Sequence, residues 1–363
     1  MPLRGALLLA IATAATACSG GNAAPDASTD AGSRPLIVDH IDDVGAFPAP
    51  TTVVGRDGTT SALIGDRVLW TFGDTFLTKP AADDGTSVRS STAAWSTVDA
   101  PLALDEPVDS AGLPFELVPY TPAELAQNQT DPQNGYALWP GAVIATSDTE
   151  AVVLFQHVVR KSGGFNADAI GTAHVTKNAT QATRDAAFLF RAPDPLFGNA
   201  GVTIEGGNAY FFECESTGIL DDHCKLARVP VASVTERSAF QFWDGTAYTS
   251  DVTRAAWFID HASYGLSIEY NPWLGRYLAV YSKPLSNDIG LRTAERIEGP
   301  WTDPEVVIAG STSGLVTSEA GVNYLAHEHS ELRSADGRTV VIGYAHPLPN
   351  FGGACRLARI VLR

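Results

Sequence analysis

Apolar and polar residues alternate in short stretches along most of this chain, and no helical period is sustained for long. Residues 68–76 and 151–159 are dominated by β-branched and aromatic residues, which strands favour. Gly, Asn, Asp and Pro separate such stretches, as at residues 206–208, where hairpin turns need them. Only residues 121–128 have helical character, with Thr121 as a candidate N-cap and Glu124 three positions later. The pattern therefore predicts an all-β protein.

A strand pattern returns about five times between Arg56 and Arg363, with one nearly literal echo. Residues 224–229 are Cys-Lys-Leu-Ala-Arg-Val, and residues 355–360 are Cys-Arg-Leu-Ala-Arg-Ile. Repeats of this kind predict a β-propeller, whose innermost strands surround a central channel. Units of roughly 60–70 residues exceed the ~40–45 of a WD-type blade, so five blades with long loops fit best. Six blades or a pair of β-sandwiches are the alternatives.

The two ends of the chain carry separate signals. Residues 1–17 combine Arg4 with an apolar stretch too short to span a bilayer, which predicts a signal peptide. Residues 15–18 resemble a bacterial lipobox, so Cys18 is the predicted lipidation site; the alternative is a plain secretory signal with Cys18 incidental. Residues 18–34 predict a flexible tether.

Residues 35–363 then form the single predicted propeller domain, held by lipid at the bacterial cell envelope and facing the periplasm or the outside. Within this domain, a short strand at residues 35–40 is expected to pair with the C-terminal strand and complete the last blade.

The charge balance narrows the class of partner. The chain has 24 basic and 41 acidic residues, a net charge of −17; removing residues 1–17 takes away Arg4 and leaves 23 against 41, a net of −18. Nucleic-acid binders need a basic stripe, so nucleic acid is not expected, and neither is electrostatic adhesion to anionic lipid. Neutral glycans and cations remain. We expect a monomer with no required cofactor.

Three cysteines follow Cys18. Cys214 and Cys224 stand ten residues apart at the two ends of a predicted hairpin, and an exported protein meets an oxidising compartment, so a Cys214–Cys224 disulfide is expected. Cys355 is left over. It either pairs with Cys214 instead or stays buried and reduced, because spacing alone excludes neither arrangement.

Several short motifs occur in an order that resembles one family. They are Asp-Gly-Thr-Thr-Ser at 57–61, Leu-Trp-Thr-Phe-Gly-Asp-Thr at 69–75, Tyr-Ala-Leu-Trp-Pro-Gly at 136–141, Tyr-Asn-Pro-Trp-Leu-Gly-Arg-Tyr-Leu at 270–278, Leu-Arg-Thr-Ala at 291–294 and Glu-Gly-Pro-Trp at 298–301. Together they resemble the DUF4185 family over nearly all of the chain after residue 40. That family resembles five-bladed propeller glycosidases of the arabinanase and fructosidase type, and some members are endo-D-arabinanases.

The resemblance implies a surface-tethered glycoside hydrolase that acts on an arabinose-containing or related polysaccharide. Its carboxylates would come from different blades and meet at the central channel. The alternative is a non-catalytic glycan-binding lipoprotein that uses the same channel. A fold is a weaker guide to activity than a site, so the candidate residues matter more than the likeness.

Glycoside hydrolysis generally needs two carboxyl groups across the scissile bond. Asp57 opens the first strand of the first unit, and the resemblance implies the base or nucleophile there; the alternative is an ordinary Asp-Gly turn. Asp74 follows Val68, Trp70 and Phe72 at period two and shares their face. An acid on an apolar face is either hydrogen-bonded structure or a site group with a shifted pKa.

Residues 325–332 form the densest polar cluster in a strand context, where His327, His329 and Glu331 share one face. Glu331 is a candidate acid or transition-state contact. In the related propellers a last-blade His helps to hold a calcium ion in the channel, which makes His327 and His329 candidate metal ligands and His327 a candidate substrate contact. The alternative is a solvated strand pair.

The fourth and second units supply the remaining candidates. Glu269 either points into the channel as a catalytic group or caps a strand pair, and Tyr270 beside it is a candidate sugar contact. Trp139 either stacks on a sugar or belongs to the core. No acid stands beside Trp139 in the second unit, where a three-carboxylate propeller glycosidase often has one. That departure favours the binding protein.

Overall fold

Strands dominate the part of the chain that the structure describes. The computed structural model describes residues 33–218, 221–263, 265–303, 305–311, 313–349 and 353–363. The predicted signal peptide, Cys18 and most of the predicted tether lie outside these residues. Residues 33–363 form one unit. Arg34, expected in the tether, packs on this unit: its guanidinium carbon lies 3.8 Å from the ring centroid of Trp273.

The described residues contain five sheets of four or more strands, and the all-β prediction is confirmed. The first sheet is β3 (Thr59–Ile64), β4 (Arg67–Phe72), β7 (Thr92–Thr97) and β8 (Ala100–Asp105). The second is β9 (Tyr136–Ala145), β10 (Glu150–Lys161), β11 (Gly164–Thr176) and β12 (Thr183–Arg184), with β13 (Phe190–Arg191) on β11. The third is β14 (Gly201–Glu205), β15 (Asn208–Gly218), β16 (Asp221–Pro230), β17 (Gln241–Trp243) and β18 (Tyr248–Thr249), with β19 (Trp257–Asp260) on β16.

The remaining elements complete the list. The fourth sheet is β20 (Ser267–Asn271), β21 (Arg276–Ser282), β22 (Ile289–Ala294) and β23 (Val306–Ile308). The fifth is β24 (Tyr324–Glu328), β25 (Thr339–Pro347), β26 (Gly353–Leu362) and β1 (Val38–Ala46). A small sheet joins β2 (Val53–Arg56), β5 (Thr75–Leu77) and β6 (Val88–Arg89). The helices are α1 (Pro122–Thr130) and short 3₁₀ turns at Pro132–Asn134, Val231–Ser233, Arg237–Ala239, Val252–Arg254 and Ser330–Leu332.

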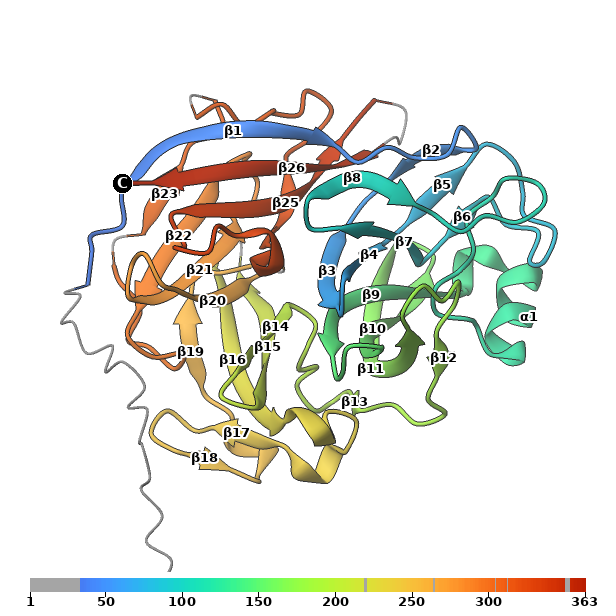
Figure 1. Ribbon diagram of the computed structural model, residues 1–363. Coiled ribbons are helices and arrows are strands. Elements are labelled where there is room, and N and C mark those ends of the chain that lie inside the picture. Colours follow the sequence, from blue (N-terminus) through green and yellow to red (C-terminus); the bar gives the residue numbers. More distant parts are fainter. Residues whose placement is uncertain (1–32, 219–220, 264, 304, 312, 350–352) are drawn as a thin grey trace, which may run out of the picture. The chain divides into compact units, whose positions relative to one another are not determined.

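The first strands of the five sheets contact one another in sequence (Figure 1): β3 with β9, β9 with β14, β14 with β20, β20 with β24, and β24 with β3. Each gap between neighbouring sheets has its own apolar core. Leu154 and Phe211 belong to the core between the second and third sheets, and Trp70 and Leu357 to the core between the fifth and first. Burying these side chains against the adjacent sheet is what holds each sheet at its angle to the next.

The predicted pairing of the two chain ends is confirmed. Strand β1 runs antiparallel to β26, with Ile41 opposite Ile360. The strand begins at Val38, later than the predicted residue 35. The fifth sheet therefore contains strands from both ends of the chain.

The predicted helix is also confirmed. Thr121 caps α1, its side chain accepting from the backbone of Glu124 while the Glu124 carboxylate accepts from the backbone of Thr121. That carboxylate also binds Arg184 through both oxygens, at 2.6 and 3.0 Å, which ties the helix to the second sheet. No helix in the described ranges is long and apolar enough to cross a membrane.

The Cys214–Cys224 disulfide is confirmed, with the two residues directly opposite each other on β15 and β16. Cys355 carries a free thiol, so the reduced alternative holds. Burial raises the pKa of this thiol to about 12, and the side chain is 1% exposed. Cys355 is therefore a small apolar core residue, with little thiolate to react.

Candidate active site

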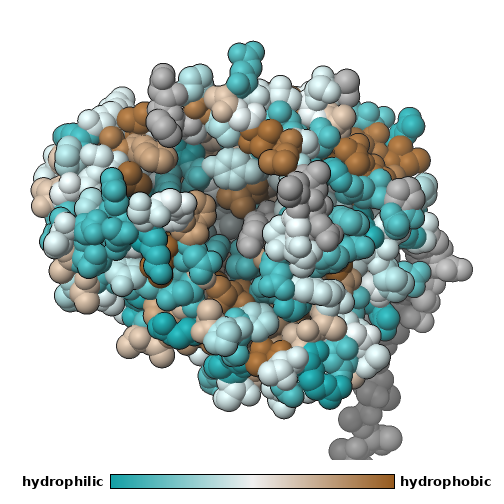
Figure 2. Space-filling view, turned by 180° about the vertical axis from the view of Figure 1, so that it is seen from behind, coloured by the Kyte–Doolittle hydropathy of each residue, from teal (hydrophilic) through white to brown (hydrophobic). Residues whose placement is uncertain are grey.

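A cavity of about 910 Å³ lies where the inner strands begin. Thr59 and Thr60 of β3, residues 139–142 of β9 and His327 of β24 line it, together with Ala200 and Gly265 just before β14 and β20. All five large sheets thus contribute to its wall. A hollow is visible near the middle of the face shown in Figure 2, with hydrophilic and hydrophobic residues around it.

Asp57 and Asp74 are held together by their backbones. Asp57 donates its backbone N–H to the carbonyl of Asp74 at 3.2 Å, and Gly73 donates to the carbonyl of Asp57 at 2.7 Å. A Cβ atom at Gly73 would lie 2.7 Å from Asp57 Oδ1, so a side chain there would displace the carboxylate. The turn before β3 and the end of β4 therefore present two carboxyl groups side by side in the cavity.

The hydroxyl of Tyr324, from the fifth sheet, donates to Asp57 Oδ2 at 2.6 Å. Burial raises the pKa of Asp57, and the bond from Tyr324 opposes that shift because it stabilises the ionised form. Burial, and the charge of the neighbouring Asp57, raise the pKa of Asp74 to about 6. Both aspartates therefore have raised pKa values.

The indole N–H of Trp139 donates to Asp74 Oδ1 at 2.8 Å. The second sheet brings no acid of its own to this position, and Asp74, from the connection between β4 and β5, lies beside Trp139. The ring of Trp139 meets the edge of Phe165, with ring centroids 4.9 Å apart. Phe165 is 67% exposed and lines the cavity, so it presents an open aromatic surface to a ligand.

Glu213 on β15 is a cavity carboxyl that the sequence analysis missed. It is only 4% exposed, and its Oε2 has no hydrogen-bond partner in the described part of the chain. Burial raises its pKa to about 7, opposed by Lys225, whose Nζ lies 3.8 Å from Oε2. The sequence did contain a signal for Glu213. At period two along the strand, this acid shares a face with Phe211, which is fully buried.

The disulfide lies next to this pair. Glu213 is directly opposite Lys225, and the neighbouring positions are Cys214 and Cys224. The covalent bond therefore fixes the strand register that places Lys225 against Glu213. Lys225 also binds Glu215 at 3.1 Å and lies 4.1 Å from the ring centroid of Trp257.

Glu331 and Glu269 do not line this cavity. Glu331 accepts a hydrogen bond from Ser61 of β3, and burial raises its pKa. Burial and the nearby Glu328 raise the pKa of Glu269 to about 8. Glu269 lies on β20, whereas Glu331 lies in the 3₁₀ turn Ser330–Leu332 that follows β24, so the predicted strand over residues 325–332 ends at Glu328. The catalytic roles of both carboxyls remain predictions.

The two histidines lie at different depths. His327 lines the cavity with Nδ1 3.2 Å from the carbonyl of Gly265, and burial lowers its pKa to about 4. His329 is buried behind it, with Nδ1 2.5 Å from the hydroxyl of Ser61, and the two ring centroids are 5.8 Å apart. Across the described residues no three His, Cys, Asp or Glu side chains are grouped to hold a metal ion. The calcium ion remains a prediction.

Tyr270 lies away from the cavity. It is 45% exposed, and its ring meets the edge of the Tyr277 ring, with centroids 5.5 Å apart. Its carbonyl accepts from Arg333 at 2.5 Å. The predicted sugar contact at Tyr270 would have to be made outside this cavity, whereas Trp139 and His327 lie within it.

The fold and the cavity together define the class of this protein: an all-β protein with five large sheets around one cavity, and carboxyl groups in the cavity wall. The sequence matches the family described as "Domain of unknown function (DUF4185)" over residues 52–330, and the chain belongs to that family. The resemblance drawn from the motifs is confirmed. No curated protein matches the sequence.

Solved structures share the fold at low sequence identity. A presumed hydrolase from Bacteroides ovatus is 12% identical with a TM-score of 0.58, the match covering 86% of this chain and 87% of that one. An exo-β-1,3-galactanase from Phanerochaete chrysosporium is 12% identical with a TM-score of 0.53, covering 90% and 64%. A GH43_1 enzyme from Xanthomonas citri is 13% identical with a TM-score of 0.51, covering 87% and 90%. At these identities the likeness establishes the fold alone.

Proposed function

We propose that this protein is a glycoside hydrolase built on a five-bladed propeller, with the five large sheets as its blades. The observation that carries the proposal is a set of three carboxyls in the cavity wall, Asp57, Asp74 and Glu213, which we call the carboxyl trio. Three more acids among the described residues also line the cavity: Asp194, Glu215 and Asp222. The pKa of Asp74 is raised to about 6 and that of Glu213 to about 7. Glycoside hydrolysis near neutral pH requires one carboxyl to be protonated while another is ionised, and raised pKa values make this possible. Structural neighbours described as a galactanase and a GH43 enzyme support it.

In this scheme Glu213 is the general acid. Its carboxyl is protonated below about pH 7 and has a free oxygen, so it is able to donate a proton to the leaving sugar oxygen. Asp57 is the base or nucleophile: burial raises its pKa, and the hydrogen bond from the hydroxyl of Tyr324 opposes that rise by stabilising the ionised form. Asp74 lies beside it, oriented by Trp139, and adds negative charge that stabilises the oxocarbenium-like transition state.

We propose an arabinose-containing or related polysaccharide as the substrate, as the family resemblance implies. The exposed face of Phe165 suits the apolar face of a sugar ring, and Trp139 is engaged in orienting Asp74. Lipidation at Cys18 would hold the enzyme at the cell envelope, where polymer is met outside the cytoplasm. We propose that it works as a monomer.

The alternative, a non-catalytic glycan-binding lipoprotein, was favoured by the missing acid beside Trp139 in the second unit. Asp74 supplies a carboxyl at that position, hydrogen-bonded to the indole itself. The missing acid in the second unit therefore no longer favours the binding protein, and we propose hydrolysis.

The test is hydrolysis of a polysaccharide panel that includes D-arabinan, L-arabinan and β-1,3-galactan, with released sugars measured by chromatography. Asp57→Asn, Asp74→Asn and Glu213→Gln should each reduce turnover by about 10²-fold or more. Glu205→Gln, at an exposed position outside the cavity, is the matched control. If no glycan is cleaved and one is retained in an affinity gel, the protein is the binding lipoprotein.

A further inference from the structure

A second cavity, of about 680 Å³, also has Asp74 in its wall. Among the residues that the structure describes, Asp74 alone lines both cavities. The second cavity is enclosed by the loop at residues 82–88, the end of helix α1, and Arg160 of β10. Both volumes fall within the about 300–1,000 Å³ typical of small-ligand sites.

The wall of the second cavity is built from groups that already have partners. Arg89 pairs with both Asp83 and Asp84, with closest N–O distances of 2.8 Å to each, so one positive charge is shared between the two acids. The Asn128 side chain bonds the backbone N–H and carbonyl of Tyr136, at 2.6 and 3.1 Å. These contacts hold the loop and the helix in place around an open space.

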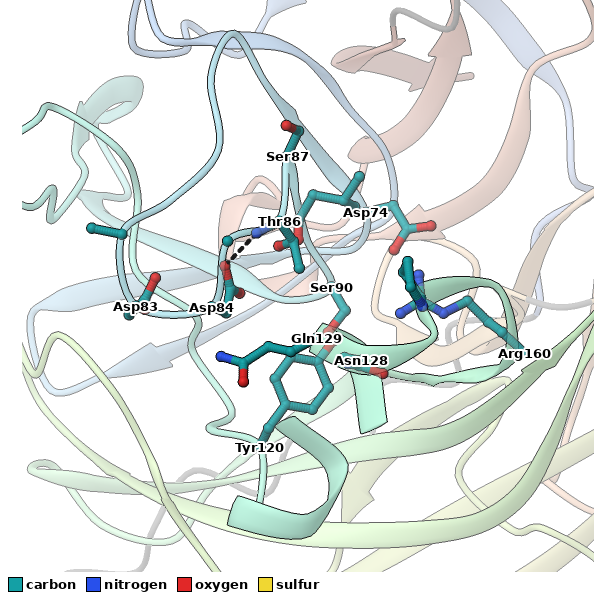
Figure 3. Close-up of a pocket in the computed structure, with 14 residues that line it drawn as sticks. Asp74, Asp83, Asp84, Thr86, Ser87, Ser90, Tyr120, Asn128, Gln129 and Arg160 are labelled. Atoms are coloured by element: carbon teal, nitrogen blue, oxygen red, sulfur yellow. Dashed lines mark hydrogen bonds between the residues drawn. The ribbon is translucent and has the colours of Figure 1, made fainter. Parts of the chain in front are cut away.

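Polar side chains of other kinds line the same cavity. Figure 3 shows Asp74 and Arg160 close together, with Ser87, Gln129 and Tyr120 around the same space. Arg160 donates to the carbonyl of Tyr136 at 2.6 Å, and the hydroxyl of Tyr120 donates to Ser90 at 2.8 Å, whereas the side chains of Ser87 and Gln129 are exposed. The exposed hydroxyl and amide supply both donors and acceptors, which is what sugar hydroxyls need.

We propose that the second cavity binds further sugar units of the same glycan chain, so that the bound chain lies on both sides of Asp74. This proposal rests on the proposed function, because it takes Asp74 as part of the reaction centre. Sugars in the second cavity lie remote from the scissile bond, and their binding energy serves to position that bond against the carboxyl trio. Cleavage efficiency should therefore increase with chain length.

The test substitutes Gln129→Trp, which places a large side chain into the cavity from an exposed helix position that no hydrogen bond of the fold depends on. Ala123→Trp is the matched control, because Ala123 is exposed on the same helix and lines neither cavity. The probes are oligosaccharides of D-arabinan and of L-arabinan, graded in length from the disaccharide upward. Both kcat/KM and equilibrium binding by calorimetry are measured.

We expect the Gln129→Trp protein to lose about tenfold or more in kcat/KM on long oligosaccharides and to match the wild type on the shortest one cleaved. The Ala123→Trp protein should match the wild type throughout. Equal losses of kcat/KM at every length, or no loss at any length, would show that the second cavity does not bind further sugar units. If the wild type cleaves nothing while Gln129→Trp still weakens binding of the longer probes alone, the hydrolase fails and the second cavity stands.

Discussion

Replacing Lys225 by Met would test the assignment of the general acid. Lys225 Nζ lies 3.8 Å from Glu213 Oε2, and the disulfide beside the pair fixes the strand register. Methionine keeps an unbranched apolar chain against Trp257, whose ring centroid is 4.1 Å from Nζ, and removes only the charge. Electrostatics therefore change while packing is largely kept.

The size of the effect follows from Coulomb's law. Two unit charges about 4 Å apart interact by about 4 kcal/mol at an effective dielectric of ~20, an upper limit here because Lys225 also neutralises Glu215. An opposite charge at such a distance commonly lowers a carboxyl pKa by about 1–3 units. Without Lys225, the pKa of Glu213 should rise from about 7 by about 1–2 units.

The assay is the pH dependence of kcat/KM on the polysaccharide that the wild type cleaves. The base must be ionised, so activity should rise with pH as Asp57, whose pKa is raised by burial, loses its proton. The acid must be protonated, so activity should fall near pH 7. Lys225→Met should move the alkaline limb to higher pH and leave the acid limb in place. Lys177→Met, which removes a surface lysine bound to Asp66, is the control. An alkaline limb that does not move would refute Glu213 as the acid.

Three further outcomes are expected. Phe165→Ala should raise KM by about 2- to 10-fold with little change in kcat, and Phe165→Trp should restore it; equal kinetics for both variants would exclude ring stacking at this position. Glu124→Gln breaks the paired contact with Arg184 and should cost about 3 kcal/mol in urea unfolding at neutral pH. Because the folded-state pKa of Glu124 is lowered, the wild type should lose this advantage as pH falls below about 4; a gap that does not narrow would contradict the ion pair. Glu269 has a folded-state pKa raised to about 8, so its burial costs stability increasingly from about pH 4 to 8, and Glu269→Gln should be the more stable protein above that range with activity retained. Lost activity at unchanged stability would instead support the catalytic role predicted for Glu269.

Much of the architecture could be predicted from the chain because it depends on neighbours in sequence. The α1 cap joins Thr121 and Glu124, and the disulfide joins the two ends of one hairpin. The repeated strand pattern predicted an all-β fold, and the short strand predicted at residues 35–40 indicated that the two ends of the chain pair. Strand boundaries were less well predicted, since the pairing partner decides where a strand begins.

The candidate site depends on contacts that spacing does not encode. Tyr324 reaches Asp57 across 267 residues, and Trp139 reaches Asp74 across 65. Neither pairing follows from any local pattern, because each joins side chains from different sheets. Glu213 was overlooked for the same reason. In the sequence it is a single acid within the apolar part of β15, and only the packing of the sheets places it in the cavity wall.

Backbone preferences and contacts between residues close along the chain set the strands, the turns, the helix cap and the cysteine pair, so these features could be predicted from the residues alone. The tertiary structure decided which carboxyls share a cavity and how far burial shifts their pKa values. Desolvation and the distance between charges depend on how the sheets pack around their common centre, and that packing is a property of the whole fold.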